Sequence, residues 1–183
     1  MSKFKAWPKI PRFENEKYVF TEKLDGTNAC VLVLPEGHEL SNAPYELSLE
    51  PVARVGGNYL WAQSRTRFIR PGDDNFGFAA WVAENADELV KLGTGYHYGE
   101  WWGRGIQRGY AQAERHFSLF YYLDDLPTDI VRRVPAIHAA TLEEARQVLI
   151  DHGSLAQQGF MNPEGVIMYA TAAKTYYKSI INK

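Results

Sequence analysis

The segment Glu22-Lys-Leu-Asp-Gly-Thr-Asn28 joins two apolar runs, and its interpretation decides the fold. The flanking runs, Tyr18–Glu22 and Asn28–Leu34, have the β-branched and aromatic composition of strands. Asp-Gly between two such runs is a common hairpin-turn signal. Lys23 has a second interpretation, because a lysine at a strand end can serve as a nucleophile where burial or nearby cations favour its neutral form. This segment alone leaves both interpretations open.

Length and composition indicate one folded domain. The chain has 183 residues, of which 45% are hydrophobic, which is enough for a sizeable core. Aromatic residues make up 14%, which favours an all-β or α+β domain, because aromatic side chains fit the pleated, half-buried surface of a sheet. Exposed aromatic faces can also stack on nucleobases.

The net charge of −2 excludes a general polycation that holds nucleic acid by charge alone. Lys and Arg gather locally instead, within residues 1–12, 65–70 and 104–115. The single cysteine, Cys30, excludes an internal disulfide framework, and its apolar surroundings predict a core position. No signal peptide or apolar stretch of about 18 residues is present. We therefore expect no membrane association and a cytoplasmic location, in a host cell if the protein is phage-encoded.

The order of elements predicts an α+β fold with mainly antiparallel sheets. A helix is expected over Phe76–Leu92, where the apolar residues share one face. The capping box Thr141-Leu-Glu-Glu144 predicts the start of a second helix, and Gly153 predicts its end. Further strands are expected over six segments: Tyr45–Glu50, Asn58–Ser64, Tyr96–Trp102, Phe117–Leu123, Gly165–Ala170 and Thr175–Ile181.

Four further segments matter when they are read beside Lys23. Arg65 follows a strand, Glu100 lies in the aromatic run Gly99-Glu-Trp-Trp-Gly103, and Phe117-Ser-Leu-Phe120 places aromatic residues on alternating faces. Glu164 and Lys178 belong to the last two strands. These five blocks, in this order, resemble the covalent nucleotidyltransferases, and most of all the RNA ligase 2-like branch with its small phage-type RNA ligases. The run Gly99–Tyr110, followed by Glu114–Phe120, is similar to a phage-ligase signature.

The resemblance spans residues 18–180 and implies both a fold and a reaction. The fold would be an α+β nucleotidyltransferase (ATP-grasp-like ligase catalytic) domain, with two mainly antiparallel sheets around a nucleotide groove and helices outside. The reaction would be ATP-dependent RNA ligation. Lys23 would attack the α-phosphate of ATP to form lysyl-AMP, the AMP would pass to a 5′-phosphate, and a 3′-hydroxyl would displace it. The implied cofactors are ATP and Mg²⁺ (or Mn²⁺).

The resemblance also implies residue roles, each with a structural alternative. Glu100 would hydrogen-bond the ribose hydroxyls, or be a surface acid. Phe117 would stack on adenine, or be a core aromatic, as Phe in a strand usually is. Glu164 would hold the metal and Asp25 would support its water shell, or both would be turn acids. The remaining nucleotide contacts would come from Glu22, Asn28 and Arg65.

The last motif departs from the family pattern, which often has two lysines two residues apart. Lys178 would be a second catalytic residue. It would contact the α-phosphate and favour the neutral form of Lys23 through like-charge repulsion. Position 176 is Tyr here, and the other lysine is Lys174. On a regular strand residues 174, 176 and 178 share a face, so Lys174 is a further nucleotide-binding candidate.

We expect residues 1–183 to form a single nucleotidyltransferase (adenylyltransferase) domain, without the OB-fold or helical C-terminal domain that many relatives carry. The partner would be nucleic acid, most simply RNA ends or nicks, bound by a monomer, with an accessory protein as an additional possibility. Three other interpretations stay open: a DNA nick ligase or GTP-using capping enzyme, a non-catalytic module that binds nucleic-acid ends, and an α+β domain whose motifs are coincidental.

Overall fold

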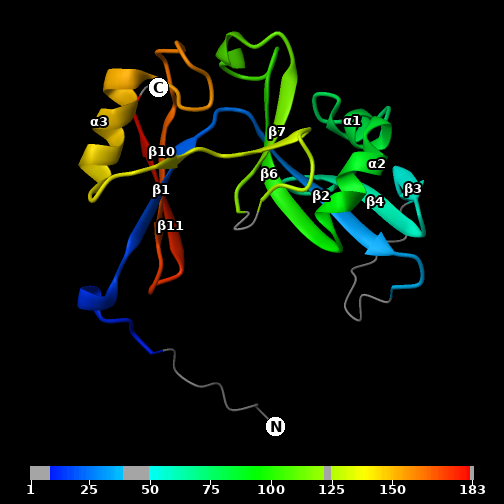
Figure 1. Ribbon diagram of the computed structural model, residues 1–183, viewed down its shortest axis with the longest axis horizontal. Coiled ribbons are helices and arrows are strands. Elements are labelled where there is room, and N and C mark those ends of the chain that lie inside the picture. The colour runs from blue at the N-terminus through cyan, green and yellow to red at the C-terminus, as the bar shows by residue number, and fades with distance from the viewer. Residues whose placement is uncertain (1–8, 39–49, 122–124, 182–183) are drawn as a thin grey trace. The chain divides into compact units, whose positions relative to one another are not determined.

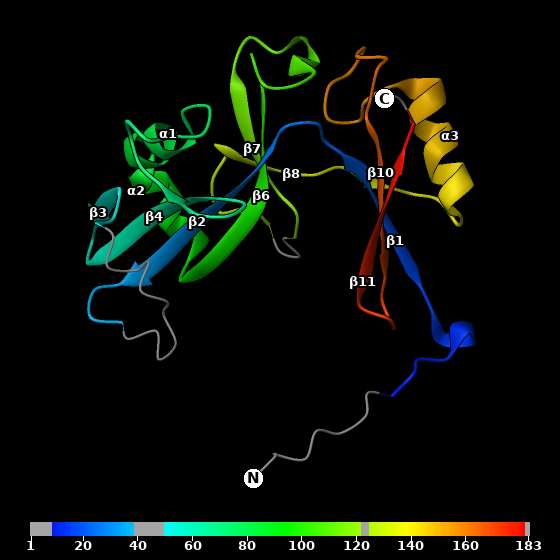
Figure 2. The same cartoon turned by 180° about the vertical axis from the view of Figure 1, so that it is seen from behind.

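The computed structural model describes residues 9–38, 50–121 and 125–181 and divides into two compact units. The first unit combines residues 1–23 with residues 135–183, and the second unit consists of residues 24–134. Figures 1 and 2 show the two units from opposite sides. Each has its own sheet and its own apolar core. In the described residues no helix is both long and apolar enough to span a membrane.

The first unit is a four-stranded antiparallel sheet with a helix on one face. Its strands are β1 (Tyr18–Lys23), β9 (Ala136–Ile137), β10 (Gly165–Ala170) and β11 (Thr175–Ile180), in the order β11-β10-β1-β9. A short 3₁₀ helix, η1 (Phe13–Asn15), precedes β1, and α3 (Leu142–His152) packs on the sheet. The core lies between α3 and the sheet and contains Phe20, Ile137, Ala145, Leu149 and Val166.

Helix α3 begins and ends as the sequence predicts. The Thr141 side chain accepts a hydrogen bond from the Glu144 backbone N–H at 3.1 Å, and the Glu144 carboxylate accepts one from Ala140 N at 2.8 Å. This reciprocal pair is a capping box. Gly153 ends the helix with a φ of +77°, and a Cβ there would lie 2.5 Å from the Phe160 carbonyl oxygen. Only glycine fits this position without strain.

Strand register gives the first sheet two distinct faces. Phe20 and Val166 pack against α3, so the side chains of Phe20, Glu22 and Val166 define a helix face. The alternate residues point the other way and define an open face. Lys23 lies in register with Gly165, and Gly165 with Ile180; Thr21 lies in register with Ile167, and Ile167 with Lys178.

The second unit is a larger sheet with short helices on one side. Its main strand order is β3-β4-β2-β6-β7-β8, with β5 paired to β4, and every pairing is antiparallel except β7 with β8. The core packs helical residues such as Phe78, Val82 and Leu89 against the sheet. The strands are β2 (Thr27–Pro35), β3 (Ala53–Val55), β4 (Asn58–Ser64), β5 (Phe68–Ile69), β6 (Gly95–Gly103), β7 (Arg115–Leu119) and β8 (Val131–Arg133). The helical segments are α1 (Phe78–Glu84), α2 (Ala86–Leu89), η3 (Val90–Leu92) and η4 (Gly109–Ala111).

The α+β class with mainly antiparallel sheets is confirmed, and Cys30 is buried as predicted. The single helix expected over Phe76–Leu92 is wrong, because Asn85 separates α1 from α2 and the last three residues form the 3₁₀ helix η3. Asn85 donates from both its backbone and its side chain to the Trp81 carbonyl, at 3.0 and 2.8 Å. Such side-chain bonds compete with helix continuation. The expected strand Tyr45–Glu50 lies outside the described residues except for Glu50, and β7 ends at Leu119 rather than Leu123.

Candidate active site

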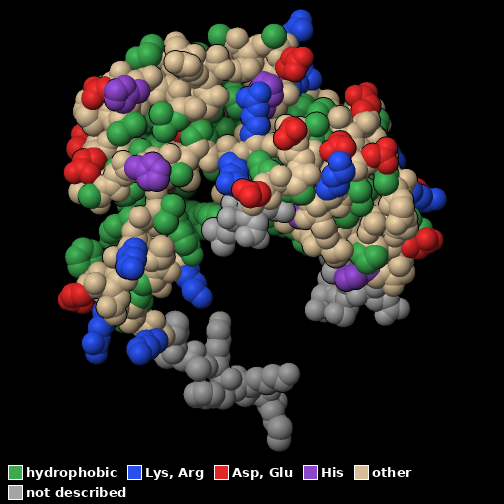
Figure 3. Space-filling view, viewed as in Figure 1, with side chains coloured by type: hydrophobic (Ala, Val, Ile, Leu, Met, Phe, Trp, Pro, Cys, Tyr) green, Lys and Arg blue, Asp and Glu red, His purple; other side chains and the backbone are tan. Residues whose placement is uncertain are grey.

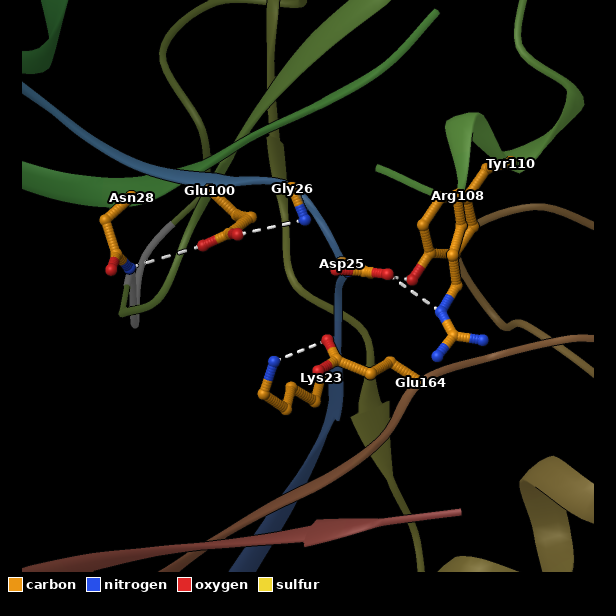
Figure 4. Close-up of polar contacts among 8 residues, drawn as sticks. All are labelled: Lys23, Asp25, Gly26, Asn28, Glu100, Arg108, Tyr110 and Glu164. Carbon is orange, nitrogen blue, oxygen red and sulfur yellow. Dashed lines mark hydrogen bonds and ion pairs between the residues drawn. The ribbon is translucent and has the colours of Figure 1, made fainter. Parts of the chain in front are cut away.

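Lys23 and Glu164 form an ion pair at the edge of the first sheet. Lys23 is the last residue of β1, and Glu164 directly precedes β10, whose first residue lies in register with Lys23. The Lys23 Nζ atom donates a hydrogen bond to Glu164 Oε2, as Figure 4 shows. The side chains are 22% and 16% exposed, respectively. The first unit therefore holds one amine and one carboxylate in contact, partly shielded yet reachable by a ligand.

Lys178 shares the open face with Lys23, but Lys174 does not belong to the strand. Lys178 lies in register with Ile167 and Thr21, two positions from Lys23 along β1, or roughly 7 Å. The strand begins at Thr175, and Lys174 lies in the preceding turn with a φ of +52°. The expectation of a shared face for residues 174 and 178 was therefore wrong. From the level of Lys23, Lys174 is roughly six residues or 20 Å along the strand.

Glu22 is a neighbour of Lys23 in sequence but points to the opposite face. Its side chain is 1% exposed, and its Oε2 atom accepts hydrogen bonds from the backbone N–H groups of Leu155 and Ala156 at 2.8 and 3.0 Å. Burial raises the pKa of the Glu22 carboxyl above its ordinary value. The structure thus places Glu22 on the face opposite Lys23 and buries it, whereas the resemblance implied a nucleotide contact. Glu22 instead holds the loop that follows α3.

Glu100 organises the beginning of β2 in the second unit. Glu100 and Asn28 lie opposite each other on β6 and β2. The two carboxylate oxygens accept hydrogen bonds from the Gly26 backbone N–H at 3.1 Å and from Asn28 Nδ2 at 3.3 Å (Figure 4). Glu100 therefore fixes the Gly26 backbone and the Asn28 side chain at the beginning of β2.

Gly26 is required by the closeness of this contact. A Cβ on Gly26 would lie 2.4 Å from the Trp101 carbonyl oxygen and 2.8 Å from Trp102 Cβ. The Asp-Gly pair is thus explained by packing of the backbone against β6, and β1 and β2 are not joined as a simple hairpin, because they belong to different sheets. The hairpin interpretation of the segment is therefore wrong.

Asp25 is held by two residues that the sequence analysis did not assign to the site. Arg108 Nε donates to Asp25 Oδ2 at 2.8 Å, and the Asp25 backbone N–H donates to the Tyr110 hydroxyl at 2.9 Å (Figure 4). Tyr110 is fully buried against the Trp102 ring, with ring centroids 5.1 Å apart. Both residues lie within the run 99–110 that carries the resemblance. That run was the available signal, but the pairing with Asp25 depends on tertiary structure.

Phe117 does not share a face with Glu100. Phe117 lies opposite Trp101, is 0% exposed and packs against Phe78 in the core, whereas Ser118 lies opposite Glu100. In this conformation the Phe117 ring offers no face to adenine, which matches the structural alternative of a core aromatic. The backbone N–H of Phe120 donates to the Tyr98 carbonyl and extends the ladder by one step. Alternation therefore places Phe120, which is partly exposed, on the face of Glu100.

The two arginines after β4 differ in their surroundings. Arg65 is exposed at the bend that follows the strand, as expected for a ligand contact or for a solvated residue. Arg67 instead binds Asp73 with both terminal nitrogens, at 2.8 and 2.9 Å. Arg65 is therefore the one of these two whose guanidinium is not committed to that carboxylate.

Each unit offers one carboxylate of the type that Mg²⁺ prefers. Within the described ranges no group of three His, Cys, Asp or Glu side chains comes together. Glu164 and Asp25 are carboxylates, the ligand type that Mg²⁺ prefers, and each contacts a cationic side chain. Mg²⁺ commonly takes one or two carboxylates and completes its shell with water and substrate phosphates. Glu164 and Asp25, each taken by itself, fit that mode, and the described residues provide no all-protein cage.

Solved structures with the same fold are RNA ligases. A Naegleria gruberi RNA ligase variant with ATP and manganese is 18% identical, with a TM-score of 0.55, and the match covers 100% of this chain and 58% of that one. Another variant of that ligase, with AMP and manganese, is 18% identical with a TM-score of 0.52, over 90% of this chain and 49% of that one. At this identity the likeness shows the fold. The chain spans about half the length of these structures.

Comparison with protein families identifies the family of this chain, which the fold alone does not. A search of curated proteins finds no match at the significance required. The RNA ligase family model matches residues 16–178, which include Lys23, Glu100, Glu164 and Lys178. Because this match covers most of the sequence, the chain belongs to the RNA ligase family.

Proposed function

We propose that this chain is an ATP-dependent RNA ligase that seals 5′-phosphate and 3′-hydroxyl ends through a covalent lysyl-AMP intermediate. The observation that carries the proposal is Lys23, which lies at a strand end, contacts the Glu164 carboxylate and shares a sheet face with Lys178. Membership of the RNA ligase family supports the same conclusion. Residues 1–183 would act as one nucleotidyltransferase domain built from the two units.

The first step would form a bond between Lys23 and AMP. The lone pair of neutral Lys23 Nζ attacks the α-phosphorus, a P–N bond forms, and the bond from the α-phosphorus to the bridging oxygen breaks. Pyrophosphate leaves with that electron pair, and the nitrogen loses a proton. Phosphoryl transfer depends mainly on positioning and charge stabilisation. Glu164 would position the amine, and Lys178 would bind the α-phosphate.

The nucleotide would be recognised by residues of the second unit. Glu100 would accept hydrogen bonds from the ribose hydroxyls, and the hydrogen bonds from Gly26 and Asn28 fix its orientation. Phe120 replaces Phe117 as the proposed adenine-stacking residue, because it shares the face of Glu100. Arg65 would contact ribose or phosphate, since its guanidinium is exposed.

A divalent cation, Mg²⁺ or Mn²⁺, would neutralise charge on the phosphates when bound. Glu164 would hold it directly or through water, and Asp25 would support its water shell from the position that Arg108 and Tyr110 fix. In the second and third steps the lysyl-bound AMP would pass to a 5′-phosphate oxygen, and a 3′-hydroxyl would attack that phosphate and release AMP.

The substrate would be RNA ends or nicks. We also propose that the protein acts as a monomer in the cytoplasm, with or without an accessory protein for strand binding. A DNA nick ligase or a GTP-using capping enzyme would use the same lysine chemistry, and a non-catalytic end-binding module would use none of it. These alternatives differ in the nucleotide that they consume and in the nucleic-acid strand that they join. One set of nucleotides and nicked substrates therefore distinguishes them.

The test supplies ATP or GTP, with Mg²⁺, and nicked RNA, DNA or hybrid duplexes. Joined product is measured on a denaturing gel. We expect sealing with ATP and an RNA 5′-phosphate end, with an adenylylated 5′ end as the intermediate. Sealing confined to DNA nicks, labelling by GTP alone, or binding without any covalent product would each contradict the proposal.

A further inference from the structure

The open face of the first sheet carries a pair of stacked tyrosines, of which one is exposed and the other half-buried. Tyr169 on β10 and Tyr176 on β11 lie directly opposite each other, with ring centroids 4.5 Å apart and planes inclined by 24°. Tyr176 is 50% exposed. The ligase chemistry proposed above gives this pair of tyrosines no role. Their distance from Lys23 indicates which part of a bound substrate they could contact.

The tyrosines share the face and the strands of the catalytic lysine. Tyr169 lies in register with Val19, and Val19 precedes Lys23 by four residues on β1. The pair is therefore roughly 13 Å from the level of Lys23, measured along the strands. That length corresponds to no more than about four nucleotides at the roughly 3.4 Å rise of a stacked strand.

The charge of this face suits a polyanion. Lys178 lies between the level of the tyrosines and the level of Lys23, and Lys174 occupies the turn that joins β10 to β11. Lys17 directly precedes β1, and its carbonyl accepts a hydrogen bond from Thr171 N in the same turn. The described strand residues on this face include no carboxylate; they are Val19, Thr21, Lys23, Ala136, Gly165, Ile167, Tyr169, Tyr176, Lys178 and Ile180. Two carboxylates lie next to these strands: Glu164 is paired with Lys23, and Glu16 accepts hydrogen bonds from the backbone N–H groups of Ala172 and Ala173 in the turn. Figure 3 shows Lys and Arg side chains beside hydrophobic ones where β1 begins and the β10–β11 hairpin turns.

We propose that Tyr169 and Tyr176 form a stacking platform for the bases of a single-stranded RNA segment, within about four nucleotides of the phosphate that reacts near Lys23. Aromatic faces beside lysines are the combination by which proteins hold single strands without reading their sequence. Lys174 contacts the phosphate backbone at the far end of the platform. The proposal rests on the proposed ligase function for the identity of its ligand.

Two neighbouring tyrosines give a matched test. Tyr176 and Tyr177 are 50% and 52% exposed and adjacent in β11, but they point to opposite faces of the sheet. Binding is measured by fluorescence anisotropy with a 5′-phosphorylated 12-nucleotide RNA labelled at its 3′ end, without ATP. We expect Tyr176→Ala to weaken binding roughly 5- to 150-fold, the range found when stacking aromatics are truncated. Tyr177→Ala should bind as the parent does.

Two further variants of Tyr176 keep the test independent of folding. Tyr176→Phe retains the ring and should retain binding, whereas Tyr176→Leu retains apolar bulk without a π face and should lose it. Lys174→Gln should reduce the slope of log K against log salt by about 0.7, the value for one single-strand phosphate contact. Parent-like binding by Tyr176→Ala and Tyr176→Leu, an equal loss in Tyr177→Ala, or an unchanged salt slope in Lys174→Gln would overturn the proposal.

AMP transfer to the parent protein is measured in parallel with labelled ATP. Loss of RNA binding in Tyr176→Leu without any AMP adduct on the parent would support the platform and contradict the ligase function. An AMP adduct on the parent with full RNA binding by Tyr176→Leu would contradict the platform alone.

Discussion

The two faces of the β11-β10-β1-β9 sheet differ in function: the open face carries the reactive lysine, and the helix face carries side chains that stabilise the fold. Lys23 and Glu22 are neighbours in β1, yet Lys23 meets Glu164 on the open face, and Glu22 is buried on the helix face, where it binds the backbone of Leu155 and Ala156. The same division separates Tyr176 from Tyr177 on β11. The comparison teaches that closeness in sequence to the reactive lysine does not make a residue part of its chemistry. Strand alternation decides that.

The largest expected effect contrasts the two lysines near the end of the chain. Lys178→Ala should slow the transfer of AMP to Lys23 about 100-fold, the usual effect of removing one group that stabilises a charged transition state. Lys174→Ala should slow it much less, because Lys174 lies in the turn before β11. Single-turnover labelling with ATP measures both rates. If the two variants lost the same activity, the division of the face by strand register would have no functional meaning.

A smaller effect comes from changing the size of one side chain on each face. Gly165 lies beside Lys23 on the open face, and a Cβ there would lie 2.1 Å from the Ser179 carbonyl oxygen. Gly165→Ala should therefore lower the free energy of unfolding by about 1–3 kcal/mol and also slow AMP transfer, because β10 and β11 must move apart beside Lys23.

The matched change on the helix face is Val166→Ala. Val166 is fully buried, and the loss of two methyl groups should cost about 2 kcal/mol. AMP transfer by the folded protein should stay at the parent rate. Urea unfolding and single-turnover labelling measure the two quantities, and a normal rate in Gly165→Ala would break the comparison.

The smallest expected effect concerns the buried acid. Because burial raises the pKa of Glu22 in the folded state, its contribution to stability is complete below its ordinary pKa of 4.5 and is lost as the pH rises through the raised value. Glu22→Gln keeps an oxygen for the Leu155 and Ala156 N–H groups without the buried charge. We expect the variant to be more stable than the parent at pH 7.

The stability gain of Glu22→Gln should shrink as the pH falls toward 4.5, since the parent carboxyl is then neutral as well. Urea unfolding at several pH values measures it. A stability gain that stays constant with pH would mean that the charge of Glu22 is not its cause. A loss of AMP transfer in the variant would mean that Glu22 takes part in the reaction.

Local sequence patterns predicted the strands well but not which way their side chains point. The segments expected near β1, β2, β6, β10 and β11 all form strands, because alternation and composition are local properties. Whether Phe117 or Phe120 shares a face with Glu100 depends on the pairing of β7 with β6, which no local pattern specifies. The pairing of Asp25 with Arg108 was missed for the same reason, since the two residues are 83 positions apart.

The central claim is tested most directly by covalent labelling of Lys23. The protein is incubated with α-labelled ATP and Mg²⁺ and then denatured, alongside Lys23→Ala and the matched variant Lys17→Ala, whose lysine precedes the same strand. The account predicts an acid-labile label that survives denaturation in the parent and in Lys17→Ala and is absent from Lys23→Ala. A Lys23→Ala protein that labels as well as the parent would contradict it.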